Sequence, residues 1–204
     1  PLQKMLEGMR ATRGLNLSPV VDGKTLPAGP FDPVSSPFSA PVPFMVGSTE
    51  TEITWNAAYK GEPIEEAELV KRVANAGKID EAAAKQLIGA YRKTRADWKP
   101  LQLWNLMGTD LSNFRTGTDA EADRRAIAEH QAPVYKYYFQ WYSPVRGGVL
   151  GSYHTLEIPF IFRNADIAES MCGNGKERYA LEDKMSASWV AFARTGNQIG
   201  RAHV

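Results

Sequence analysis

One of the three histidines of the chain lies in surroundings that could support acid–base chemistry. His154 follows the glycine-rich segment 147–151 and precedes the apolar run 155–162, which a proline interrupts. The segment before these glycines, 133–142, is dense in aromatic and β-branched residues and is predicted to be a strand. Loops that follow strands usually carry the chemistry of α/β proteins, so His154 is a candidate general base.

Two glutamates follow another predicted strand. The compact apolar run 42–47 is bounded by proline and glycine, and Glu50 and Glu52 come directly after it. Successive strands thus end in an acid and then in a base. In α/β-hydrolases the chain order is serine, acid, histidine, and the acid orients and stabilises the imidazolium. The local sequence alone does not choose between Glu50 and Glu52.

Periodicity and capping residues predict the other elements. Apolar positions on one stripe, with Asp80 as N-cap, predict a helix over 79–92. The capping-box spacing of Thr118 and Glu121 predicts a helix that runs to about His130. Weaker patterns predict the remaining segments: a weakly helical stretch at 1–13, an extended pair at 18–27 around Asp22 and Gly23, a proline-rich loop at 27–43, and a helix from about Leu181 to the cap Gly196.

The predicted strands are too few for a complete α/β domain of 204 residues. Both look like interior strands, apolar on both faces and flanked by helices. The chain also begins at Pro1, with no initiator methionine and no signal peptide. We therefore expect it to be a piece of a longer protein whose other strands complete the sheet.

Composition and charge exclude several classes of partner. With 24 basic and 23 acidic side chains, the net charge of +1 provides no field that would attract nucleic acid. No apolar run approaches the ~18 residues that a membrane span needs, so we expect a soluble protein, cytoplasmic or secreted. The single cysteine, Cys172, cannot form an internal disulfide and is interpreted as a bystander. The sequence indicates no oligomeric state.

Five blocks of the sequence resemble, in order, the type-B carboxylesterase family, which includes para-nitrobenzyl esterases and cholinesterases. The resemblance extends from about residue 15 to residue 197. It implies that residues 1–198 are the C-terminal portion of a single α/β-hydrolase domain, with the N-terminal sheet strands and the nucleophile elbow missing. The blocks are 18–23, 47–52, 133–139, 151–162 and 189–197.

The resemblance implies site residues at the matching positions. Glu52, five residues after Gly47, matches the family's triad acid, and His154 matches its triad histidine. The implied reaction is hydrolysis of small-molecule carboxylic esters through an acyl-enzyme, with no metal and no organic cofactor. The family's nucleophile belongs to a Gly-x-Ser-x-Gly elbow, and the 204 residues contain no such motif. We therefore expect this chain alone to be inactive.

Other serines do not fit the nucleophile's role. Ser18 and Ser36 precede prolines, which lack the N–H that an oxyanion hole needs. Ser48 and Ser152 lack the flanking glycines of an elbow.

Several residues near the candidate pair have alternative interpretations. Glu157 could form a metal pair with His154, although a structural hydrogen bond is the preferred role. His130 is interpreted as a solvated residue at a helix end. Trp141 and Tyr142 belong mainly to the core or border the substrate pocket.

Two other functions remain as alternatives: a non-catalytic adhesion or binding protein of the same fold, and an independent small helical binding protein. Retention of Glu52 and His154 argues against the first, and the strand content argues against the second.

The last six residues depart from the family, which usually continues after Asn197 with a proline and a tryptophan-containing segment. Residues 199–204 are the translation of ATC GGA AGA GCA CAC GTC, the start of a widely used sequencing adapter. We therefore expect 199–204 to be a non-native, adapter-derived tail, with Gln198 at the junction and no function for His203.

Overall fold

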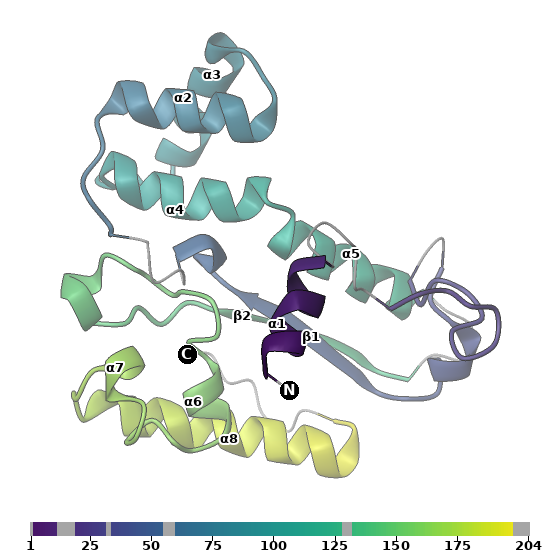
Figure 1. Cartoon of the computed structure of the whole chain (residues 1–204). Coiled ribbons are helices and arrows are strands. Elements are labelled where there is room, and N and C mark those ends of the chain that lie inside the picture. The colour runs from purple at the N-terminus through teal and green to yellow at the C-terminus, as the bar shows by residue number, and fades with distance from the viewer. Residues whose placement is uncertain (1, 12–18, 32–33, 55–59, 128–131, 198–204) are drawn as a thin grey trace.

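The computed structural model describes residues 2–11, 19–31, 34–54, 60–127 and 132–197 (Figure 1). The predictions for Ser18, His130 and 198–204 lie outside these residues. The elements are α1 (Leu2–Ala11), η1 (Pro37–Ser39), β1 (Phe44–Thr49), η2 (Glu52–Thr54), α2 (Glu66–Gly77), α3 (Glu81–Arg92), α4 (Pro100–Leu111), α5 (Phe114–Ala126), β2 (Val134–Phe139), η3 (Val145–Gly148), α6 (Ile158–Ile161), α7 (Glu169–Cys172) and α8 (Glu177–Thr195).

The two predicted strands pair with each other. β1 and β2 are parallel, with Phe44 opposite Val134 and Thr49 opposite Phe139. Helix α5 lies on one side of this ribbon and α8 on the other (Figure 1). Because the strands are parallel, the loops that follow them leave from the same end of the sheet.

The side chains of β2 alternate between these two helices. Tyr135 and Tyr137 face α8, where their rings meet Phe192 and Trp189 edge to face at 5.8 and 5.0 Å. Tyr138 points the other way, and its ring stacks under the guanidinium of Arg115. The expectation of a strand that is apolar on both faces is therefore wrong for β2, because one face carries exposed or half-exposed polar groups.

Helices α2, α3 and α4 pack together, and α4 lies over η2 and leads into α5 (Figure 1). The predicted cap of α3 is confirmed, because the Asp80 carboxylate accepts the N–H of Ala83 at 2.8 Å. The core between these three helices consists of Leu69, Val70, Val73, Ala84, Ile88, Leu103 and Met107.

Two predicted elements differ in the structure. Asp22 accepts three successive N–H groups, from residues 24, 25 and 26, so its side chain forms the turn and no strands flank it. Helix α5 begins at Phe114, and Thr118 lies inside it, where its hydroxyl bonds back to the carbonyl of Phe114. The predicted start of this helix at Thr118 is therefore wrong, because the capping-box spacing of Thr118 and Glu121 occurs inside the helix.

The long helix α8 closes the other core. Its predicted end is confirmed, because Gly196 adopts the left-handed conformation at φ 66°. Leu181 and Met185 pack against Leu156 and Phe160, which belong to the segment that carries His154. Within the described residues, no helix is both long and apolar enough to cross a lipid bilayer.

Candidate active site

Glu52 lies in the turn that follows β1. It begins the 3-10 helix η2, and its side chain is only 7% exposed. The backbone N–H of Thr49 donates to Oε1 of Glu52 at 2.7 Å. One carboxylate oxygen is therefore fixed by the backbone, and the other is available to a partner.

The loop with His154 is aligned beside this turn by backbone pairing. Thr51 forms an isolated parallel bridge with Tyr153, and the N–H of Thr51 donates to the carbonyl of Ser152 at 2.8 Å. The hydroxyls of Thr51 and Thr54 both donate to the carbonyl of Leu150. These hydrogen bonds fix the position of the His154 loop relative to the turn that carries Glu52.

The structure brings His154 and Glu52 into contact. Nδ1 of His154 lies 2.6 Å from Oε2 of Glu52, a distance typical of a charge-assisted hydrogen bond. The histidine side chain is 38% exposed, whereas the glutamate is almost completely buried. A carboxylate on Nδ1 fixes the tautomer in which Nε2 is the basic nitrogen. The pair can therefore act as a general base and its orienting acid.

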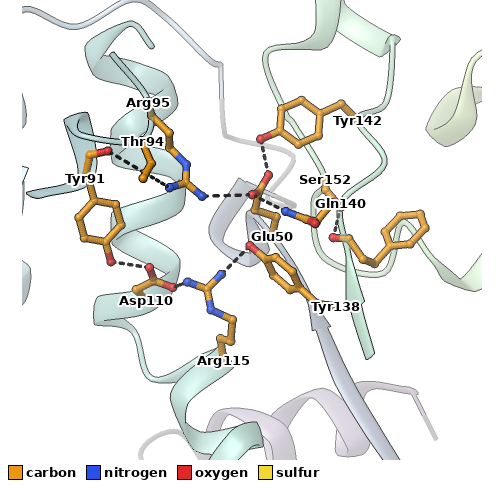
Figure 2. Close-up of polar contacts among 11 residues, drawn as sticks. Glu50, Tyr91, Thr94, Arg95, Asp110, Arg115, Tyr138, Gln140, Tyr142 and Ser152 are labelled. Carbon is orange, nitrogen blue, oxygen red and sulfur yellow. Dashed lines mark hydrogen bonds and ion pairs between the residues drawn. The ribbon is translucent and has the colours of Figure 1, made fainter. Parts of the chain in front are cut away.

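Glu50, the alternative acid, contacts a different set of groups (Figure 2). Its buried carboxylate accepts hydrogen bonds from the hydroxyl of Tyr142 and from Nε2 of Gln140, and Arg95 lies 3.9 Å away. Sequence reasoning weighed Glu50 only as an acid and missed this cluster.

Glu157 follows His154 by three residues and lies close enough to Glu52 to feel its charge. The hydroxyl of Tyr137 donates to its Oε1 at 3.4 Å, which agrees with a structural role. Burial raises the pKa of Glu157, and the charge of Glu52 acts in the same direction. Among the described residues, no group of three or more His, Cys, Asp and Glu side chains could hold a metal ion.

Phe114 borders the exposed side of the pair and was not predicted. Its ring centroid lies 5.9 Å from that of His154, and the residue is 48% exposed. Its position at the start of α5 was concealed by the mistaken start of that helix.

Trp141 and Tyr142, the residues considered for the pocket, lie in different surroundings. Trp141 packs edge to face on Phe160 at 5.0 Å in the core, whereas Tyr142 binds Glu50.

Ser48 and Ser152, which do not fit the nucleophile's role, and the bystander Cys172 are all buried. Ser152 is fully buried and its hydroxyl donates to the carbonyl of Phe139, while Ser48 is a buried residue of β1. Cys172 is also fully buried, and burial raises the pKa of its thiol to about 11. A thiol with this pKa is almost entirely protonated at neutral pH.

Comparisons with known proteins agree on one family. The model described as "Carboxylesterase family" matches residues 2–203. The para-nitrobenzyl esterase of Bacillus subtilis (strain 168) is 29% identical over an alignment of 188 residues, and the match covers 90% of this chain and 35% of that protein. The phenmedipham hydrolase of Pseudarthrobacter oxydans is 28% identical over an alignment of 195 residues, and the match covers 88% of this chain and 35% of that protein.

Solved structures of the same kind match the fold. A PNB esterase has a TM-score of 0.62 at 25% identity, and a thermophilic PNB esterase has a TM-score of 0.61 at 26% identity. Each match covers 98% of this chain and 40% of the solved chain. The chain thus spans about a third of the length of the para-nitrobenzyl esterase and of the phenmedipham hydrolase, 35% in each case.

Proposed function

Because the chain belongs to the carboxylesterase family, we propose that it supplies the acid and the histidine of a Ser-His-Glu triad. The family matches confirm the resemblance found in the sequence, and the fold is the C-terminal part of an α/β-hydrolase. The observation that carries the proposal is the 2.6 Å contact between Nδ1 of His154 and the buried carboxylate of Glu52.

The proposed reaction is hydrolysis of a small-molecule carboxylic ester. A serine outside these 204 residues attacks the ester carbonyl while Nε2 of His154 takes the hydroxyl proton. The imidazolium then gives this proton to the departing alcohol, which leaves an acyl-enzyme. Water attacks the acyl-enzyme by the same proton route and releases the acid. Glu52 holds the ring and stabilises its positive charge in both steps.

Two further features support a catalytic role over a purely binding one. The two relatives compared with this chain are an esterase and a hydrolase. The pair also combines a buried acid with Nδ1 of a histidine, which leaves Nε2 as the basic nitrogen. A non-catalytic adhesion protein would need neither the buried acid nor the oriented histidine.

Mutation of the pair in the full-length protein tests the proposal. With a p-nitrophenyl ester, His154→Ala is expected to lower kcat by roughly 10⁴-fold or more. Glu52→Gln should cost less, on the order of 10²- to 10⁴-fold, because a poorly oriented base remains. Asp183→Asn, which removes an exposed ion pair with Arg163, is the control. A folded His154→Ala enzyme with undiminished kcat would contradict the proposal.

A further inference from the structure

A polar cluster surrounds the buried carboxylate of Glu50, which lies two residues before Glu52 (Figure 2). Glu50 is 3% exposed although it is a carboxylate. Burying such a group is costly unless several partners compensate it. Its partners come from separate parts of the chain, so the carboxylate links segments that are distant in the sequence.

Three segments meet at Glu50. Tyr142 and Gln140, which donate hydrogen bonds to it, belong to the segment between β2 and the His154 loop. Arg95, 3.9 Å away, belongs to the connection between α3 and α4 and is itself stacked on Trp98. The backbone N–H of Glu50 also donates to the carbonyl of Phe139 at the end of β2. Both the side chain and the backbone of Glu50 therefore attach the Glu52 turn to its surroundings.

A second part of the cluster, around Asp110, lies at the junction of α4 and α5. Asp110 accepts a hydrogen bond from Tyr91 at 2.5 Å and binds the guanidinium of Arg115. Arg115 in turn donates to the hydroxyl of Tyr138 at 2.7 Å. The residue before Arg115 is Phe114, whose ring lies beside His154. The cluster is thus linked to the Glu52 turn through Glu50 and, through Arg115, the chain neighbour of Phe114, to the start of α5.

We propose that Glu50 is a positioning residue of this active site, which acts by holding the turn that keeps Glu52 against His154. The proposal rests on the proposed function of that pair. Glu50 does not touch the reacting atoms; its carboxylate fixes the turn two residues before Glu52. Loss of its charge should loosen the Glu52 turn, and a misplacement of about 1 Å in a catalytic group can cost ~100-fold in rate.

The test uses the full-length protein with two variants of the cluster and one matched control. Glu50→Gln removes the charge, and Tyr142→Phe removes only one hydrogen bond from Glu50. Tyr135→Phe is the control, because the Tyr135 hydroxyl also makes a side-chain hydrogen bond, to Asn197 at 2.6 Å. Tyr135 lies near the start of β2, away from the pair.

The kinetic readout separates positioning from binding. Glu50→Gln is expected to lower kcat ~10- to 100-fold and Tyr142→Phe ~3- to 10-fold, with KM within about threefold in both. Tyr135→Phe should stay within about twofold of the parent in both constants. If Glu50→Gln fails to fold, the kcat and KM of Tyr142→Phe test the proposal in its place.

A structural readout is independent of turnover. Crystal structures of the variants should show a longer or broken contact between Nδ1 of His154 and Oε2 of Glu52, and an intact one in Tyr135→Phe. This measurement tests positioning even if the His154 and Glu52 variants show that the pair is not catalytic.

Four results would overturn the proposal. The first is a folded Glu50→Gln enzyme with unchanged kcat and an unchanged contact, and the second is an equal loss in Tyr135→Phe. The third is a loss confined to KM. In the fourth, Glu50→Gln is far more damaging than Glu52→Gln, which would make Glu50 the triad acid itself.

Discussion

The hydroxyl of Tyr137 donates to Oε1 of Glu157, and the other carboxylate oxygen, Oε2, is buried without a hydrogen-bond partner among the described residues. Burial therefore raises the pKa of Glu157 above its ordinary value near 4.5, with the charge of Glu52 as a further cause. A buried carboxyl of this kind favours its neutral form.

The raised pKa gives a defined dependence of stability on pH. Between pH 4.5 and the raised pKa, the folded state holds a proton on Glu157 that the unfolded state has lost. The contribution of Glu157 to stability is therefore fully present below pH 4.5 and is lost as the pH rises through the raised pKa. The Gln side chain of Glu157→Gln cannot titrate. The Tm of this variant minus the Tm of the parent should therefore increase as the pH rises.

Thermal unfolding of the two full-length proteins across this pH range measures the difference. Glu81→Gln, which alters an exposed glutamate in the first turn of α3, is the control and should follow the parent. A constant difference in Tm between Glu157→Gln and the parent at every pH would contradict the assigned pKa shift.

The isolated 204-residue chain is expected to be aggregated or molten. The described strands pair only with each other, so each has an unpaired edge, and such edges recruit other chains. Large apolar side chains are also exposed, including Phe38 at 82%, Phe162 at 72% and Ile167 at 81%. Each forgoes roughly 1.5–3 kcal/mol of burial, whereas domains have only about 5–15 kcal/mol of net stability.

Size-exclusion chromatography, thermal unfolding and amide NMR of the isolated chain check this expectation. The full-length protein, measured in parallel, should give a sharp transition. A soluble monomer of the isolated chain with cooperative unfolding and dispersed amide signals would show that it folds independently.

The sequence predicts those parts of the fold whose signals are local. The apolar run before Gly47 and the aromatic run before Trp141 are strands, because short runs bounded by turn residues have few alternatives. Asp80 and Gly196 mark helix ends because each satisfies orphan backbone groups by itself.

Helices α2 and α4 were not predicted, although their sequences carry usable signals. Leu69, Val70 and Val73 in α2 lie on one face, and Pro100 occupies the first turn of α4, where proline is favoured. Residues of α4 are buried nearly all round, so a clear stripe is missing there.

The Glu50 cluster could not be predicted from the sequence. Its members Arg95, Asp110 and Arg115 come close to the strand residues only when the helices pack against the sheet. The alternation of Tyr138, Gln140 and Tyr142 indicates a polar face on one side of the strand's end, but it does not identify the partner. Local sequence left Glu50 and Glu52 equivalent, and only the tertiary structure gives them different neighbours.

Covalent labelling with a fluorophosphonate, followed by peptide mass spectrometry, tests the central claim most directly. The full-length protein should be labelled at one serine outside these 204 residues, and His154→Ala should slow labelling by roughly 10³-fold or more because the base is lost. The isolated chain should remain unlabelled. Labelling of a serine within the chain, such as Ser36 or Ser48, or an undiminished rate in His154→Ala, would contradict the claim that His154 and Glu52 serve a nucleophile supplied from elsewhere in the protein.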